Sequence, residues 1–155
     1  MIILKTEVNV NNITGKQVYD FMLNSTDNDY QRWWPGTHIA FRTIKRYAGN
    51  IGNLVYFDEY VGERRLKFNA IVTEAISGKK ITWQMDKVIK LPGWLALEFE
   101  DIENGVRIIH TLSLGYKGIG KIFDKVLELY LSKKFQMDLD EHAKTEFPML
   151  AKMLV

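Results

Sequence analysis

The chain has 155 residues, of which 46% are hydrophobic and 26% charged, with no cysteine and a formal net charge of +2. This length suits one domain with a substantial core, so we predict a single domain over 1–155. The small charge argues against nucleic-acid binding, and the absence of cysteine excludes disulfides, thiol catalysis and cysteine-ligated metals. Neither a signal peptide nor an apolar stretch of ~20 residues occurs, which predicts a cytoplasmic protein without integral membrane association.

The N-terminal segment predicts a strand followed by a capped helix. Residues 3–10 alternate between apolar and polar side chains, as a half-buried strand does. Thr14 and Gln17 then have the spacing of a capping box, and apolar residues flank them as in a hydrophobic staple. We therefore predict a helix over 15–24.

A second short helix follows over 25–32, with Thr26 as its N-cap. Trp33, Trp34, Pro35 and Gly36 end it, because Pro and Gly stop a helix and turn the chain.

The middle of the chain predicts an antiparallel sheet. Further strand patterns cover 39–46, 54–60, 65–74, 81–85, 95–99 and 106–114. Short turns join them, among them Ser77-Gly78 and the strong hairpin signal Asn104-Gly105. Consecutive strands joined by short turns pair antiparallel, which gives about seven strands in all.

A long helical pattern closes the chain over 118–154. Its apolar stripe begins at Ile119 and continues in steps of four residues from Leu131 to Phe147. Such steps overshoot the helical turn, so the stripe winds around the helix. Because Pro148 removes a backbone donor, we predict a kink or an irregular last turn there.

Four passages carry a resemblance to a known superfamily: GNIGNLVYFDEY, RRLKFNAIVTEA, ITWQM and ENGVRIIHTLSLGYKGIGK. With the order of elements, they make the chain resemble the START-like, pollen-allergen-like helix-grip superfamily, also called SRPBCC, which includes polyketide cyclase-like proteins. The resemblance implies an α+β helix-grip fold. In it a curved antiparallel sheet of about seven strands wraps a long C-terminal helix, with two short helices near the N-terminus. It also implies the binding of hydrophobic ligands such as lipids, sterols or polyketides.

Candidate ligand-binding residues are the aromatic, apolar and histidine side chains expected to face the space between sheet and helix. They are Trp33, Trp34, His38, Phe68, Trp83, Leu97, His110, Phe123 and Tyr130. Trp33 and Trp34 are equally explained as a packed aromatic corner with His38 on a loop, since buried Trp is mostly core. His110 lies on an apolar strand face, either as a hydrogen-bonded core residue or as a polar group inside a cavity.

His38 and His110 are also the candidate catalytic residues, as proton shuttles. Glu59 and Glu98 are candidate partner carboxylates for His110, but the sequence does not fix the strand faces on which they lie, and the alternation of Glu98 with Leu97 and Phe99 indicates solvent. His142 shares a helix face with Asp138 and Glu146, which we interpret as surface pairing, and no metal-ligand spacing joins the histidines. We therefore predict no metal site and no cofactor. The near P-loop at 115–121 lacks the Ser or Thr that binds magnesium and is interpreted as a tight turn.

Three functions remain open. The leading hypothesis is binding or transport of a small hydrophobic molecule between the sheet and the C-terminal helix. The second is an enzyme of the polyketide cyclase, aromatase or dehydratase kind that uses a cavity histidine. The third is a protein-interaction module with a filled core and an unknown protein partner.

Overall fold

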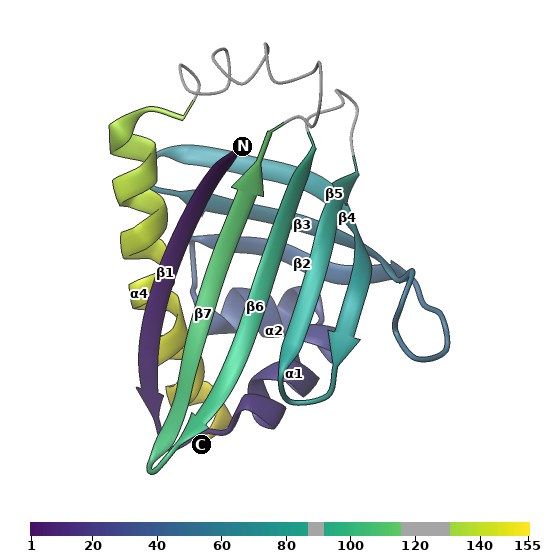
Figure 1. The fold of residues 1–155 in the computed structure, drawn as a ribbon, viewed down its shortest axis with the longest axis vertical. Coiled ribbons are helices and arrows are strands. Elements are labelled where there is room, and N and C mark those ends of the chain that lie inside the picture. Colours follow the sequence, from purple (N-terminus) through teal and green to yellow (C-terminus); the bar gives the residue numbers. More distant parts are fainter. Residues whose placement is uncertain (87–91, 116–130) are drawn as a thin grey trace.

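The computed structural model describes residues 1–86, 92–115 and 131–155, which form one antiparallel sheet and three helices (Figure 1). The strands are β1 Ile2–Asn11, β2 His38–Lys45, β3 Leu54–Val61, β4 Arg64–Ile76, β5 Lys80–Asp86, β6 Gly93–Ile102 and β7 Gly105–Leu114. The helices are α1 Gly15–Asn24, α2 Asp27–Trp33 and α4 Lys133–Leu154. The predicted α+β helix-grip fold, with seven strands, is confirmed.

The sheet has the strand order β1-β7-β6-β5-β4-β3-β2, in which every neighbouring pair is antiparallel. It curls so strongly that β2 and β3 cross behind β1, β7 and β6 (Figure 1). The helix α4 lies beside β1 along the open side of this curl, and α1 and α2 close its lower end. The curved sheet and α4 therefore enclose the interior of the molecule between them.

The two short helices begin where their caps predict. The side chain of Thr14 accepts a hydrogen bond from the backbone N–H of Gln17, and the Gln17 side chain accepts one from the backbone N–H of Thr14. Thr26 and Asp29 form the same reciprocal pair at the start of α2. These bonds satisfy backbone donors that the first helical turn leaves without partners.

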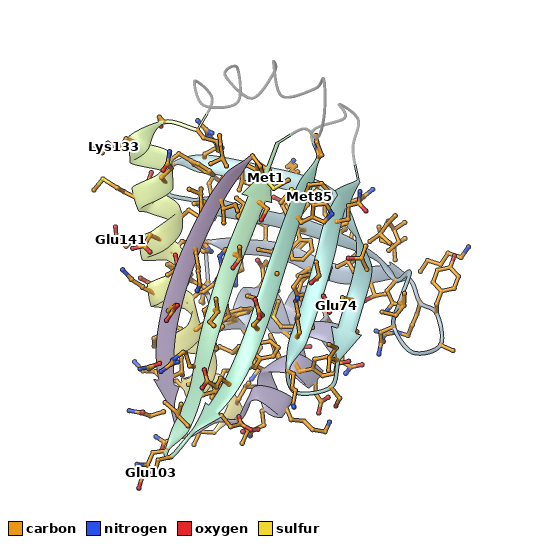
Figure 2. All side chains as sticks on the ribbon, viewed as in Figure 1. Met1, Glu74, Met85, Glu103, Lys133 and Glu141 are labelled. Carbon is orange, nitrogen blue, oxygen red and sulfur yellow. The ribbon has the colours of Figure 1, made fainter. Side chains whose placement is uncertain are left out.

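Two hydrogen bonds between distant segments fix α4. The hydroxyl of Thr6 on β1 donates to Asp140 over 2.7 Å. The indole N–H of Trp33, at the end of α2, donates to the backbone carbonyl of Glu146 over 2.6 Å. The outer face of α4 is polar, and Glu141 points away from the sheet (Figure 2). The rotation of α4 about its axis is thus set from both sides.

The buried side chains form two apolar clusters. The larger one joins the sheet to α1, α2 and the second half of α4, and Trp83, Phe147 and Leu150 are among its members. The smaller one lies at the first half of α4 and contains Val61, Leu112, Leu131, Phe135 and Leu139. The four-residue stripe predicted for the C-terminal helix is buried from Leu131 to Phe147.

The predicted bounds of the last helix are wrong. A single helix over 118–154 is excluded because Ser132 has extended ψ and caps α4 by accepting a hydrogen bond from the N–H of Phe135. The part of this prediction over 118–130 lies outside the described residues. Of the two outcomes predicted at Pro148, an irregular last turn does not occur, since α4 continues through Pro148 to Leu154. Pro148 is half-buried and lines a surface pocket.

Within the described ranges, no helix is long and apolar enough to cross a membrane.

Candidate functional site

Four ionisable side chains meet inside the molecule, and we call them the polar core group: His38, Glu59, His142 and Glu146. Their side chains are 0%, 15%, 6% and 8% exposed, respectively. Each offers one ligand atom, a histidine nitrogen or a carboxylate oxygen, and these four atoms all lie within 4.8 Å of one another. Burying so many ionisable groups together costs stability unless they are paired or bind a cation.

Strand register brings two members together. His38 begins β2 and lies directly opposite Glu59 on β3, and the pairing shifts between His38 and Ala40. Such a β-bulge re-aims side chains and is frequent next to functional sites. Glu59 follows Val55 and Phe57 on the inward face of β3. The side chains of His38 and Glu59 therefore both project from the inner face of the sheet into the interior.

The other two members come from α4. His142 and Glu146 are four residues apart and therefore lie on the same helix face, beside the buried stripe that contains Leu139, Ala143 and Phe147. The Trp33 bond to the Glu146 carbonyl holds this part of α4 in place. Contact between α4 and β3 completes the group.

The histidine nitrogens and carboxylate oxygens of the group lie close together, but their geometry is not that of hydrogen bonds. Nε2 of His38 lies 3.3 Å from Oε2 of Glu146 and 3.8 Å from Oε2 of Glu59. Nε2 of His142 lies 3.2 Å from Oε2 of Glu59 and 3.4 Å from Oε2 of Glu146. Among the described residues, both ring nitrogens of His38 and Nε2 of His142 are buried without a hydrogen-bond partner.

Aromatic residues surround the group. Tyr30 stacks on His38 with ring centroids 3.9 Å apart, and its hydroxyl donates to Oε2 of Glu59 over 2.8 Å. Trp33 meets His38 edge-on at 4.6 Å, and Trp34 lies against His142 at 4.9 Å. These contacts lock the positions of the two imidazoles and one carboxylate.

The group has strongly perturbed protonation equilibria. Burial disfavours the charged form of His142, but Glu146 and Glu59 outweigh burial and raise its pKa to about 10. Burial likewise opposes ionisation of Glu146, yet His142 and His38 lower its pKa to about 2. Burial and the Glu59 carboxylate raise the pKa of Tyr30 well above its usual value, so the hydroxyl stays protonated and can donate.

A cavity of ≈ 40 Å³ adjoins the group between the sheet and α4. Apolar side chains make most of its wall, and its polar lining comes from Tyr30, Glu59, His110, His142 and Glu146. Since one water needs ~10–15 Å³ of such volume, the space is no larger than about three waters. Burial lowers the pKa of His110, which is therefore a neutral imidazole near pH 7.

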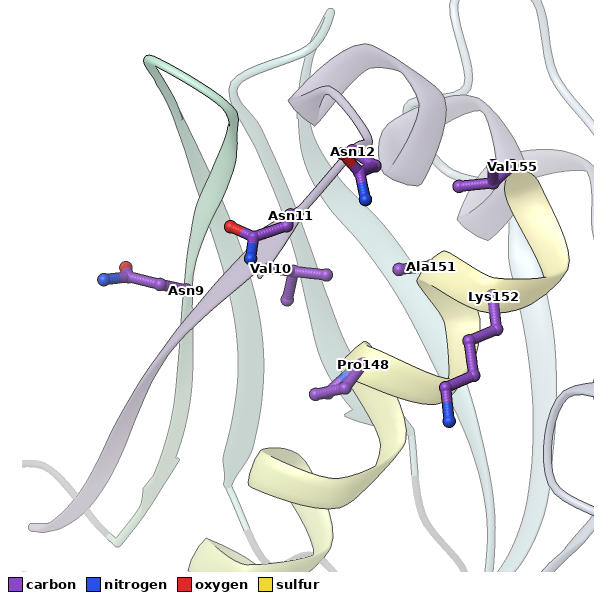
Figure 3. A pocket seen from close by; sticks show the side chains of 8 residues that line it. All are labelled: Asn9, Val10, Asn11, Asn12, Pro148, Ala151, Lys152 and Val155. Carbon is purple, nitrogen blue, oxygen red and sulfur yellow. The ribbon is translucent and has the colours of Figure 1, made fainter.

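Two surface pockets can be compared with this interior cavity. One of ≈ 350 Å³ lies outside the polar core group and is lined by Trp34, Thr37, Tyr60, Gly62, Asp138, Glu141, His142 and Thr145. His142 therefore borders both the interior cavity and this pocket. Another pocket of ≈ 490 Å³ lies between the ends of β1 and α4 (Figure 3), where Lys152 is the one ionisable side chain in its lining. It lacks the convergent ionisable groups of the interior site.

The structure places the predicted site residues in different environments. Trp33, Leu97 and His110 line the interior cavity. Trp34 lines the surface pocket, and His38 belongs to the polar core group without lining the cavity. Phe68 is half-buried and stacked on Phe57, and Trp83 is fully buried in the larger apolar cluster. Phe123, Tyr130 and the near P-loop from position 116 onward lie outside the described residues.

Sequence reasoning missed the polar core group. The interpretation of His142 and Glu146 as surface pairing is wrong, since both are buried. Asp138, the third residue of that face, pairs instead with Lys134 at 3.3 Å. His38 is also not on a loop, because it begins β2. The alternation of Val55, Phe57, Glu59 and Val61 was a readable signal that Glu59 faces inward.

Comparison with solved structures supports the fold. Similar structures include Ara h 8.0201, with a TM-score of 0.66 and 9% identity over 99% of this chain and 97% of that chain. A START superfamily protein from Mycobacterium smegmatis has a TM-score of 0.63 and 11% identity over 99% of each chain. The protein TTHA0849 from Thermus thermophilus has a TM-score of 0.65 and 11% identity over 99% of this chain and 97% of that chain.

No protein-family model matches the sequence, and no curated protein matches it. At such low identities the structural likeness concerns the fold alone. The resemblance to the START-like helix-grip superfamily is confirmed at that level.

Proposed function

We propose that this protein binds a small molecule with an apolar body and a polar group, held between the sheet and α4. The cavity carries this proposal, because it joins an apolar wall to a few convergent polar side chains, the usual composition of a ligand site. A START superfamily protein shares the fold, which agrees with such a use. Lipids, sterols and polyketide-like molecules are the ligand classes to test.

The polar group of the ligand is expected beside His110. This imidazole is buried and neutral near pH 7, so one ring nitrogen donates a hydrogen bond while the other accepts one. A ligand hydroxyl or carbonyl group matches that pattern. Replacing His110 by Leu should therefore weaken binding of a ligand that carries such a group more than binding of its purely apolar analogue.

The cavity must widen to take a whole ligand. Its ≈ 40 Å³ is well below the ~300–1,000 Å³ of typical ligand pockets. It lies where the two apolar clusters meet, with Leu139 from the smaller cluster facing Phe57, Leu97 and Phe147 from the larger one. We propose that the ligand enters between these clusters, because parting them leaves the packing within each one intact.

Native mass spectrometry followed by organic extraction tests the proposal directly. The purified protein is examined for a co-purified molecule and is then titrated with fatty acids, sterols and aromatic polyketides. A molecule released at near one-to-one stoichiometry, or saturable binding from this panel, is the expected result.

Two Leu→Ala variants on α4 make a matched pair for this experiment. Leu139→Ala removes side-chain atoms from the cavity wall, whereas Leu150→Ala removes the same atoms from a fully buried position outside it. Both should lose ~2–5 kcal/mol of stability, but Leu139→Ala alone should change the affinity for the ligand. If neither the wild type nor Leu139→Ala binds anything, the proposal fails, and a filled-core interaction module becomes the better account.

A further inference from the structure

The polar core group has a composition that binds transition metals. It offers two imidazole nitrogens and two carboxylate oxygens, and all four ligand atoms lie within 4.8 Å of one another. Imidazole suits Zn²⁺, Cu²⁺, Fe²⁺ and Ni²⁺, whereas Mg²⁺ and Ca²⁺ prefer oxygen ligands alone. Among these, Zn²⁺ is commonly held by four such ligands in a closed tetrahedron.

The distances favour a metal over a plain ion pair. Charged N–H···O bonds between His and a carboxylate close to ~2.7–2.9 Å. The four N···O separations here are longer, from 3.2 to 3.8 Å. Four ligands at ~2.0–2.1 Å from a tetrahedral Zn²⁺ stand ~3.3–3.4 Å apart along each edge. Three of the four observed N···O separations, from 3.2 to 3.4 Å, match that spacing, and the fourth, at 3.8 Å, is longer.

Burial gives a second, independent indication. His38 is 1% exposed, and both of its ring nitrogens lack a hydrogen-bond partner among the described residues. Nε2 of His142 is buried and also has no such partner. A buried polar atom left without a partner costs ~1–3 kcal/mol. A cation between the imidazoles and the carboxylates would satisfy both Nε2 atoms, and two carboxylates would balance its two charges.

We infer that His38, Glu59, His142 and Glu146 form a four-ligand site for a divalent transition metal, for which Zn²⁺ is the best-fitting ion. The site joins β2 and β3 to α4, so the metal cross-links the sheet to the helix that it grips. Glu59, His142 and Glu146 also line the cavity proposed above for the ligand, but metal binding does not require that a ligand be bound.

Tyr30 is a positioning residue for this site. Its hydroxyl donates to the same oxygen of Glu59 that faces both histidines, and its ring stacks on His38. Partners of this kind orient the metal ligands, and their removal usually lowers metal affinity ~10–100-fold. Tyr30→Phe keeps the ring and the stack and removes the hydroxyl alone.

The experiment uses the full chain, freed of metal with a chelator and titrated with zinc chloride, with magnesium chloride as the comparison ion. Calorimetry and elemental analysis of the dialysed protein measure affinity and stoichiometry. We expect one Zn²⁺ per chain and no Mg²⁺ at equal concentration. Tyr30→Phe should weaken zinc binding ~10–100-fold, and His142→Gln should weaken it further.

Glu146→Gln and Glu141→Gln form a matched pair, because they make the same chemical change on one helix at a buried and at an exposed carboxylate. The first should abolish tight zinc binding, and the second should leave it unchanged. X-ray absorption of the wild-type zinc complex provides a measurement that requires no variant to fold. Two imidazole ligands at ~2.0–2.1 Å support the site.

Three results overturn the inference: zinc bound no better than magnesium, zinc binding equal in Glu146→Gln and wild type, or an absorption spectrum without imidazole ligation.

Discussion

Replacing His38 by Leu should change the stability of the metal-free protein only slightly, although His38 is nearly fully buried. Both of its ring nitrogens lie inside the molecule without a hydrogen-bond partner among the described residues. Leucine has a similar size and no polar atom, so it removes this penalty. It also removes the ring contacts with Tyr30, Trp33, Trp34 and His142. The contact between Nε2 and the Glu146 carboxylate is lost as well.

The two effects can be compared. Each unsatisfied buried polar atom costs ~1–3 kcal/mol, so the two nitrogens together cost ~2–6 kcal/mol. Each lost ring contact forfeits ~0.5–1.5 kcal/mol. Four such contacts forfeit ~2–6 kcal/mol, so the two effects nearly cancel and the free energy of unfolding should change by less than ~2 kcal/mol, which corresponds to less than ~4–8 °C in Tm for a chain of this size.

Urea unfolding with a chelator present measures this change, with the slope of the transition checked for constancy. His142→Leu serves as the contrast, because His142 pairs electrostatically with Glu146 and Glu59. Its loss leaves buried carboxylates without a cation and should cost ~3–5 kcal/mol. A loss in His38→Leu as large as that in His142→Leu would refute the reasoning, since it would mean that the nitrogens of His38 have partners in solution. With zinc present, the wild type should become clearly more stable than His38→Leu.

Three further predictions concern stability elsewhere in the fold. Asp58 accepts two hydrogen bonds from Arg65, which lower the pKa of its carboxyl group in the folded protein. The stability that this pair contributes is therefore present above the pKa of Asp58 in the unfolded chain and is lost as pH falls through its pKa in the folded protein. Because Arg65 is partly exposed, Asp58→Asn should cost only ~1 kcal/mol of stability at pH 7 and less at pH 3. Urea unfolding at the two pH values measures this difference, and an equal cost at both would contradict the prediction. Gly105→Ala would drive its Cβ into the carbonyl of Val10 and should cost ~1–3 kcal/mol or prevent folding; an unchanged Tm would exclude that clash. Thr14→Ala removes the N-cap of α1 and should cost ~1 kcal/mol, a value that Thr14→Ser should largely restore.

Local signals predicted the elements well. The caps at Thr14 and Thr26 fixed the starts of α1 and α2, because a cap depends on bonds between residues three apart. The two-residue signal Asn104-Gly105 placed the β6–β7 hairpin for the same reason. Alternating side chains then assigned the strands and their inward faces.

The apolar pattern did not locate the start of α4, because one long helix and a shorter capped helix can carry the same stripe of buried residues. The apolar stripe runs through Leu131 into Phe135 without interruption, so it hides the break at Ser132. Ser132 is a favourable N-cap residue, and that local signal was present. Periodicity alone cannot separate one long helix from a shorter helix preceded by another buried segment.

The sequence by itself determined the order of the elements and their caps and turns, because these follow from interactions within a few residues and from alternation along the chain. The helix-grip fold was what the resemblance to a known superfamily implied. Only the tertiary structure decided the site. His38 meets Glu59 through strand register and a bulge, and both meet His142 and Glu146 through the rotation of α4, which bonds from Thr6 and Trp33 set. A cavity of ≈ 40 Å³ likewise depends on small displacements of packed elements, which no local pattern encodes.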